Sequence, residues 1–356
     1  MSRFWSKLVH DLHPYVPGEQ PAGGTLTKLN TNESPFGPSP RALLAIRAAA
    51  DDSLRLYPDP RAAALCQALA DYHGVRPEQV FVGNGSDEVL AHAFVALLRQ
   101  DGRLLHPDIT YGFYPAYCTL FGIVADKIPL DPLFRVRLSD YERPCGSIII
   151  PNPNAPTGIA LSRAEIKHLL NAHSGRPVVI DEAYVDFGAE TSIPLIASHP
   201  NLLVVRTMSK SRALAGLRVG YAIGDAALIE ALVRVKDSFN SYPLGRPAQA
   251  GAIASLEDED YFQRGLAAIV TERNRLSAGL VGLGFEVLPS SANFVFARHR
   301  ARGGAEIAAS LRAHSILVRH FNLPRIADFL RITVGTSAET DRLMDALERI
   351  VEGAIG

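Results

Sequence analysis

The chain has little cysteine and almost no net charge. Three cysteines, Cys66, Cys118 and Cys145, occur in 356 residues without CxxC spacing, and no histidine pair has HExxH spacing. A disulfide framework and a zinc site are therefore not expected, and we predict no bound metal. The formal net charge of −1 provides no basic surface for nucleic acid or anionic lipid, so the expected ligand is a small molecule.

Long apolar runs are missing as well. No stretch is long enough to span a bilayer, and the N-terminal MSRFWSKLVHDL lacks the apolar core and the small-residue cleavage site of a signal peptide. We therefore expect a cytoplasmic protein that does not enter a membrane. A hydrophobic content of 47 % still supports a substantial core in one domain or two.

The sequence does contain a strand that ends in a polar turn with a single lysine. The apolar run LLVV from Leu202 is typical of a buried strand, and Thr207, Ser209 and Lys210 follow it. Desolvation and a nearby cation such as Arg218 would both lower the pKa of this lysine. A lysine free of its proton can attack a carbonyl. The alternative, that Lys210 is a solvated loop residue, is the ordinary case for a lone lysine.

A carboxylate earlier in the chain favours the interpretation of Lys210 as a reactive amine. The run VVIDEAY places Asp181 directly after an apolar strand at 178–180, with Tyr184 three positions further on. A carboxylate at the end of such a strand is costly unless it meets a partner. Asp181 is therefore a candidate site residue.

A glycine-containing turn predicts an anion site. GNGSDE follows a strand at 79–82 and leads into a helix, and free amides at a helix N-terminus bind anions. We expect a phosphate to contact the backbone amides of Gly85, Ser86 and Asp87. A nucleotide fingerprint is excluded, because Glu88 stands where glycine is needed and no Walker motif occurs.

Strands and helices alternate through the first two thirds of the chain. Ser39 before Pro40, and the capping-box pair Ser162 and Glu165, predict two helix starts. The alternation predicts an α/β protein whose mostly parallel sheet is covered by helices, with the ligand at the carboxyl ends of the strands. After NSYPLGRPAQA a helical pattern at 261–283 and two half-buried strands predict a smaller α+β module.

The elements DEAY, SK and AGLRVGY, in this order, resemble the cofactor-binding core of the pyridoxal-phosphate (PLP) aminotransferases of fold type I. The histidinol-phosphate aminotransferases are the most similar group, and the likeness runs from LHPY to LRITVGT. It implies a large domain at 51–245 with a seven-stranded sheet, a small domain at 30–50 and 246–356, and an N-terminal arm at 1–29. It also implies a homodimer with a shared active site.

The resemblance assigns roles around the cofactor. Lys210 would bind PLP covalently and move the substrate proton, Asp181 would keep the pyridine nitrogen protonated, and Tyr184 would contact the phenolic oxygen. Further cofactor contacts are implied for Thr207, Ser209 and Arg218 near the phosphate, Tyr111 on the ring, and Tyr57 from the partner subunit. An aromatic core residue and a helix-entry packing residue are the alternatives for Tyr111 and Tyr57.

One motif departs from the family. Members usually carry asparagine before PTG, where it contacts the phenolic oxygen, but PNPNAPTG has Ala155 there. Either Asn154 takes over this contact, or Tyr184 makes it alone.

Substrate contacts are implied for residues at both ends of the chain. Tyr15 would shape the pocket, Asn32 would lie beside the substrate carboxylate, and Arg331 would bind that carboxylate. Arg319 would join Arg331 at a substrate phosphate. A buried loop tyrosine and internal salt bridges are the alternatives for Tyr15 and the two arginines, although an unpaired guanidinium within a strand is costly.

The expected activity is amino transfer between L-histidinol phosphate and 2-oxoglutarate by a ping-pong mechanism. An aromatic aminotransferase and a threonine-phosphate decarboxylase on the same fold are alternatives. A noncatalytic ligand-binding protein and a nicotinamide oxidoreductase are alternatives from other classes.

Overall fold

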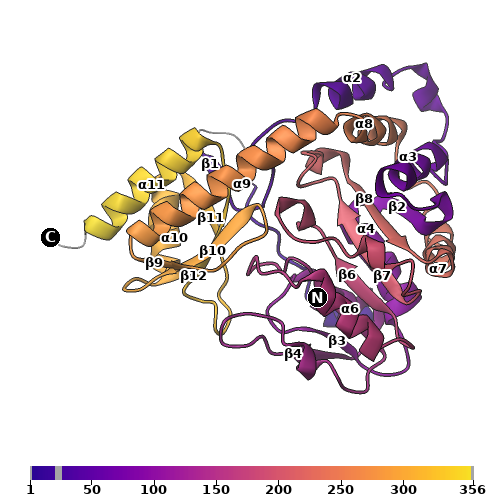
Figure 1. Ribbon diagram of the computed structural model, residues 1–356, viewed down its shortest axis with the longest axis horizontal. Coiled ribbons are helices and arrows are strands. Elements are labelled where there is room, and N and C mark those ends of the chain that lie inside the picture. The colour runs from indigo at the N-terminus through magenta and orange to yellow at the C-terminus, as the bar shows by residue number, and fades with distance from the viewer. Residues whose placement is uncertain (1, 21–25, 354–356) are drawn as a thin grey trace.

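Two β-sheets lie side by side in the computed structural model, which describes residues 2–20 and 26–353 (Figure 1). The larger sheet has seven strands, in the order β2 (Val80–Asn84), β8 (Val219–Gly224), β7 (Leu202–Thr207), β6 (Val178–Asp181), β5 (Ser147–Pro151), β3 (Leu104–Pro107) and β4 (Ala125–Ile128). The smaller has five, in the order β1 (Thr27–Leu29), β11 (Ile316–His320), β12 (Phe329–Thr333), β10 (Phe294–His299) and β9 (Phe285–Val287).

The larger sheet is mostly parallel, as predicted. Only the pairings of β8 with β2 and β7 are antiparallel. The strands β5, β6 and β7 are buried along their whole length, which explains their continuous apolar sequences. The carboxyl ends of β2, β5, β6 and β7 therefore meet at one edge of the sheet.

Helices cover both faces of this sheet. Alternate strand residues take opposite sides, so Val178 and Ile180 pack in one core cluster and Val179 in another. The first cluster includes residues of α3 (Ala63–His73), α6 (Arg163–Ala172) and α8 (Arg246–Leu256). The second includes residues of α4 (Gly85–Ala93), α5 (Phe113–Phe121) and α7 (Ala226–Asp237). The predicted α/β class with a helix-covered sheet is confirmed.

Three helices pack on one face of the smaller sheet (Figure 1). They are α9 (Glu259–Gly282), α10 (Gly304–Ala313) and α11 (Ser337–Glu352). Leu330 and Ile332 of β12 point into this core. Arg331 lies between them and therefore points to the opposite face, toward the larger sheet's edge.

The segments predicted to start helices behave as expected. Ser39 accepts a hydrogen bond from the amide of Ala42 at the start of α2 (Pro40–Ala48), and the capping box of Ser162 and Glu165 forms. The helix that follows the GNGSDE turn begins within the turn itself, at Gly85. Its last turn, 94–98, is a π-helix.

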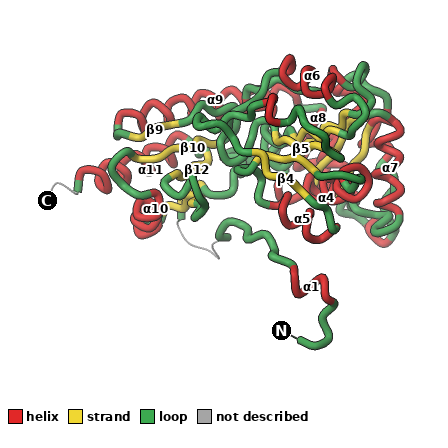
Figure 2. The backbone as a smooth tube through the Cα atoms, turned by 90° about the horizontal axis from the view of Figure 1, so that it is seen from below, coloured by secondary structure: helices red, strands yellow, loops and turns green. Residues whose placement is uncertain are grey.

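The predicted domain boundaries remain a proposal, and three features bear on them. β1 begins at Thr27 and pairs with β11, inside the segment predicted as the arm. α2 packs on α8, which also contacts α3 and β8 of the larger sheet. The short helix α1 (Lys7–Asp11) projects away from the rest of the described chain (Figure 2). No helix in the described ranges has the length and apolar character needed to cross a bilayer.

Gly220 offers a test of how tightly β8 packs on the start of α4. A Cβ atom at Gly220 would overlap the amide nitrogen of Ser86 and the carbonyl carbon of Gly85, which are backbone atoms. We expect Gly220→Ala to lower the free energy of unfolding by about 1–3 kcal/mol, because the two segments must move apart. Urea denaturation measures this change.

The matched control is Gly216→Ala. A Cβ atom at Gly216 has no neighbour within 4 Å, so this variant should unfold close to the wild-type midpoint. Equal unfolding midpoints for both variants would show that β8 does not constrain the turn at Gly85.

Candidate active site

A cavity at the carboxyl edge of the larger sheet collects most of the predicted site residues. It encloses about 900 Å³ of space, part of it open to solvent. Its walls come from the turns after β2, β5, β6 and β7, from the arm, and from β11 and β12 of the smaller sheet. The predicted residues that line it are Tyr15, Asn32, Ser86, Asp87, Tyr111, Asp181, Tyr184, Thr207, Ser209, Lys210, Arg218, Arg319 and Arg331.

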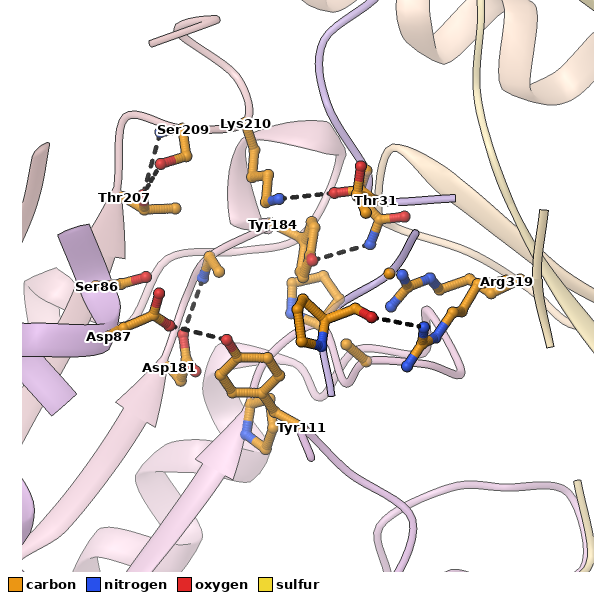
Figure 3. Close-up of a pocket in the computed structure, with 18 of the residues that line it drawn as sticks. Thr31, Ser86, Asp87, Tyr111, Asp181, Tyr184, Thr207, Ser209, Lys210 and Arg319 are labelled. Atoms are coloured by element: carbon orange, nitrogen blue, oxygen red, sulfur yellow. Dashed lines mark hydrogen bonds between the residues drawn. The ribbon is translucent and has the colours of Figure 1, made fainter. Parts of the chain in front are cut away.

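Lys210 reaches into this cavity from the turn after β7 (Figure 3). Its Nζ donates a hydrogen bond to the carbonyl oxygen of Thr31, 3.0 Å away. Burial, and then the positive charge of Arg331, lower the pKa of Lys210 to about 8. An amine with this pKa is partly unprotonated near neutral pH, so it can act as a nucleophile and as a base.

Asp181 is buried at the end of β6. One of its oxygens accepts a hydrogen bond of 2.9 Å from the hydroxyl of Tyr114, and the other accepts from the amide of Ala183 at 3.3 Å. Burial raises the pKa of Asp181 to about 6 despite these two hydrogen bonds. The carboxylate would gain from a cationic N–H group in the cavity, because it has no cation of its own among the described residues.

Hydroxyls, free amides and one guanidinium lie together at the other end of the cavity. Arg218 pairs with Asp87 at 3.1 Å, and its Nη1 is 3.5 Å from the hydroxyl of Ser209. The hydroxyls of Ser209 and Thr207 are 3.0 Å apart (Figure 3). A Cβ atom at Gly85 would overlap the Arg218 guanidinium, so glycine lets this cation approach the start of α4. The set can hold a phosphate.

Two tyrosines form an aromatic wall. The Tyr111 hydroxyl donates a hydrogen bond of 2.8 Å to Asp87 (Figure 3). The Tyr15 ring lies 6.0 Å from the Tyr111 ring and 4.6 Å from Phe113. Residues 15–18 of the arm therefore return to the cavity of their own chain.

The two arginines of the smaller sheet differ in their surroundings. Arg331 donates from Nη2 to the carbonyl of Asn30 at 2.9 Å, and its buried Nε has no partner. It forms no ion pair with a described carboxylate, which is the arrangement expected of an anion-binding residue. Arg319 instead donates to the carbonyls of Val16 and Pro17, at 3.1 Å and 3.3 Å, and so holds the arm.

Three predicted residues do not line the cavity, namely Gly85, Asn154 and Tyr57. The amide nitrogen of Asn154 donates to the carbonyl of Ile109 and to the hydroxyl of Thr157, at 3.0 Å and 3.1 Å. Ala155 takes the place on the cavity wall, so Asn154 is not placed to replace the family's asparagine. Tyr57 is 77 % exposed and stacks on Tyr242, with ring centroids 4.7 Å apart.

The sequence did not predict the residues that hydrogen-bond to the site residues or to their turns. Tyr114 was not separated from its aromatic neighbours, although its hydroxyl is the donor to Asp181. Arg206 at the end of β7 pairs with Glu182 and Asp186, and Asp186 accepts a hydrogen bond from Ser211, the neighbour of Lys210. The charged residues beside DEAY and SK are the only sequence signal for this network.

The donor set fits PLP. A basic lysine, a buried carboxylate, an aromatic wall and a phosphate cradle face one cavity, and these match the aldehyde, pyridine nitrogen, ring and phosphate of the cofactor. Metal binding has no comparable support. Among the described residues, no group of three or more histidine, cysteine, aspartate or glutamate side chains is arranged to hold an ion.

Comparison with known proteins identifies relatives along the whole chain. Residues 25–347 match the family model "Aminotransferase class I and II". A protein named histidinol-phosphate aminotransferase from Gluconacetobacter diazotrophicus is 63 % identical over 351 residues, covering 99 % of both chains. Histidinol-phosphate aminotransferase 2 of Rhizobium meliloti is 62 % identical over 351 residues, covering 99 % of this chain and all of the relative.

A solved structure shares the fold. The crystal structure of histidinol-phosphate aminotransferase from Sinorhizobium meliloti, in complex with pyridoxal-5'-phosphate, matches with a TM-score of 0.89 and 26 % identity. The match covers 99 % of each chain. The cavity therefore lies in a fold for which a PLP complex is known.

The raised pKa of Asp181 predicts a pH-dependent stability for the cofactor-free protein. The folded state holds this proton more tightly than the unfolded state, so stability falls as pH rises from the ordinary value of 3.8 through about 6. The asparagine of Asp181→Asn cannot ionise. Its stability relative to wild type should therefore rise between about pH 4 and pH 7, by on the order of 3 kcal/mol.

Urea denaturation of both proteins at several pH values measures this difference. Asp345→Asn, at an exposed position of α11, is the control and should show no such pH-dependent gain. A pH-independent difference for Asp181→Asn would mean that Asp181 ionises as an ordinary solvated carboxylate.

Proposed function

Because the chain belongs to the class I and II aminotransferases, we propose that its cavity binds PLP and transfers the amino group of L-histidinol phosphate to 2-oxoglutarate. The observation that carries this proposal is the convergence of Lys210, Asp181 and Arg218 on one cavity. Relatives about 60 % identical over their whole length carry the corresponding name. A histidine-biosynthetic transaminase is the function that these findings support.

The residues around the cavity would hold the cofactor at four points. The amides of Gly85, Ser86 and Asp87, with Ser209, Thr207 and Arg218, bind the phosphate. Asp181 holds a proton at the pyridine nitrogen, and Tyr114 orients the carboxylate. Tyr111 supports the ring, and Tyr184 contacts the phenolic oxygen. Bound PLP supplies an electron sink for the charge left when the substrate's Cα proton departs.

Lys210 has two tasks in this arrangement. Its amine would hold the cofactor by a covalent link, and the same amine would be the base that removes the proton from the substrate Cα. The pKa of about 8 suits both, because the amine can lose and regain a proton near neutral pH. Asp186, which pairs with Arg206, accepts a hydrogen bond from Ser211, the neighbour of Lys210 in the turn.

Substrate recognition falls to the smaller sheet and the arm. Arg331 has no carboxylate partner in the described part of the chain and would bind the carboxylate of glutamate or the phosphate of histidinol phosphate. Arg319 would join it, which requires its guanidinium to exchange an arm carbonyl for the phosphate. Tyr15 and Asn32 complete the pocket wall. The two relatives described above, at 63 % and 62 % identity, are named histidinol-phosphate aminotransferases; neither is named an aromatic aminotransferase or a threonine-phosphate decarboxylase.

We also propose that the protein is a homodimer. Large apolar side chains are exposed around the Tyr57 and Tyr242 stack, and such patches are typical of interfaces. They belong to Leu54, Leu56, Tyr57, Phe239 and Tyr242. Tyr57 would reach the cofactor phosphate of the other subunit, so each active site would need two chains. Localisation in the cytoplasm stays a prediction.

The visible spectrum tests the cofactor and its attachment. With PLP bound, the wild-type protein should be yellow, borohydride should fix the cofactor to Lys210, and histidinol phosphate should bleach the yellow band. Lys210→Ala should lose the covalent link, and its turnover should fall by about 10² to 10⁴-fold or more, because the base is absent. Peptide mass spectrometry locates the attachment.

Lys167→Ala is the control, since Lys167 is exposed on α6 and distant from the cavity. Near wild-type turnover by Lys210→Ala would refute the assignment of the lysine. A yellow band that does not respond to histidinol phosphate would support the proposed cofactor but contradict the proposed substrate.

The exposed patch predicts a variant that separates the subunits. Phe239 is 83 % exposed, so Phe239→Glu should leave the fold of one chain intact but place a charge in the interface. We expect a monomer in light scattering, with transamination reduced at least tenfold. Val124→Glu, also at an exposed apolar position, should stay dimeric and active. A dimeric, active Phe239→Glu protein would place the interface elsewhere.

A further inference from the structure

Asn32 is almost completely enclosed between the two sheets. It is 1 % exposed and has a positive φ of 55°, a conformation that asparagine tolerates better than most residues. Its carbonyl accepts a hydrogen bond of 3.0 Å from the side chain of Asn293, and its amide donates to the hydroxyl of Thr333 at 3.0 Å. The backbone at Asn32 is therefore held by the smaller domain's residues.

These contacts determine which way the Asn32 side-chain amide faces. The hydroxyl oxygen of Thr333 accepts from the Asn32 backbone N–H, and its own proton is donated to Oδ1 of Asn32 at 3.1 Å. Oδ1 thus faces Thr333, and Nδ2 must face the other way. Nδ2 donates to the hydroxyl oxygen of Tyr184 at 2.9 Å, as the dashed line to the Tyr184 oxygen shows (Figure 3).

The hydrogen bond from Asn32 constrains Tyr184 in turn. Its hydroxyl oxygen is occupied as an acceptor, so its proton is free to be donated in another direction. Tyr184 packs against a small apolar cluster that contains Ala155. The Ala155 side chain is a methyl group with no proton to donate, so of these two residues on the cavity wall only Tyr184 can donate a hydrogen bond from its side chain.

We propose that Asn32, clamped by Thr333, is a positioning residue that directs the Tyr184 hydroxyl proton toward the phenolic oxygen of bound PLP. This inference rests on the proposed function. It assigns Asn32 a role in orienting Tyr184 in addition to any contact with substrate. Because Thr333 and Arg331 lie on the same strand, β12, the relay also connects the substrate-binding strand with the cofactor.

Charged groups from several elements face Tyr184 and bear on the test. They are Arg331 of β12, Asp181 of β6, Asp87 of α4 and Lys210, whose Nζ lies 6.0 Å from the ring centroid. The variants below leave all four unchanged. Thr333→Val also adds no charge, so a shift of its midpoint reports on the relay, whereas Asn32→Asp adds a carboxylate whose own effect must be separated.

The experiment follows the visible band of the PLP-loaded protein as a function of pH. A hydrogen-bond donor to the phenolic oxygen stabilises the negative charge on that oxygen. The oxygen then has a lower affinity for the proton that it shares with the Lys210 nitrogen. Losing that donor should therefore raise the pH midpoint of the band, by roughly half a unit to one unit. We expect this rise in Thr333→Val, which keeps the side-chain shape but has no hydroxyl.

Asn32→Asp is the second variant, because a carboxylate accepts the Tyr184 proton instead of donating to its oxygen. It should raise the midpoint. The part of this rise that persists when Asn32→Asp is added to Tyr184→Phe measures the added charge, and the part that disappears measures the relay. Thr340→Val is the control: it removes a buried hydroxyl on α11 that has no contact with Asn32.

The outcomes separate the two proposals. Midpoints of Thr333→Val and Asn32→Asp equal to wild type, or a shift in Thr340→Val as large as in Thr333→Val, would overturn the relay and leave the proposed function standing. A wild-type protein with no visible band in the presence of PLP would overturn the proposed function, and the relay with it.

Discussion

The burial of charged groups at one edge of the larger sheet is the constraint on which the rest of the structure depends. Desolvation disfavours the charged form of every ionisable group, so it raises the pKa of Asp181 to about 6 and lowers that of Lys210 to about 8. Both groups can then exchange protons near neutral pH. The same edge must hold Arg206, whose charge is compensated by Glu182 and Asp186. The groups that can exchange protons and the ion pairs that stabilise the turns thus belong to neighbouring residues of the same turns.

The close approach of β8 to the start of α4 shapes the end of the cavity where we propose that a phosphate binds. Glycine at positions 85 and 220 allows β8 and the first turn of α4 to meet without intervening side chains. The guanidinium of Arg218 occupies the space that a side chain at Gly85 would fill, and it pairs with Asp87 of the same turn. Free amides and a fixed cation are therefore assembled on rigid elements before a phosphate binds. Little rearrangement is needed for binding, which favours affinity.

Contacts between the two sheets connect the residues proposed to recognise the cofactor with those proposed to recognise the substrate. Asn32 joins Thr333 of β12 to Tyr184 of the larger sheet's edge, while Arg331 on the same strand bonds to the carbonyl of Asn30. The arm adds a third connection, because Arg319 holds the carbonyls of Val16 and Pro17 beside Tyr15. The proposed anion site at these arginines and the proposed contact with the cofactor ring accordingly share one set of backbone segments. Two hydrogen bonds, from Thr333 to Asn32 and from Asn32 to Tyr184, would transmit a shift of β12 to the Tyr184 hydroxyl.

The sequence alone determined the α/β class and the order of the turns that follow the strands, and it singled out Asp181, Lys210 and Arg218 as candidate residues. The class and the turns follow from local patterns, namely apolar runs that must be buried strands, polar residues directly after them, and glycines before a helix, whereas the roles predicted for the three residues rest on the resemblance to the aminotransferases. Only the tertiary structure decided which groups meet. Tyr114 and Asp181 are 67 positions apart, and Asn32 and Thr333 are 301 apart, so no local pattern relates them. The direction of the Asn154 amide, toward Ile109 and Thr157 and away from the cavity, also depends on the path of the backbone around it. Local sequence sets which residues reach the sheet edge, whereas packing between distant segments sets the partner and the direction of each hydrogen bond.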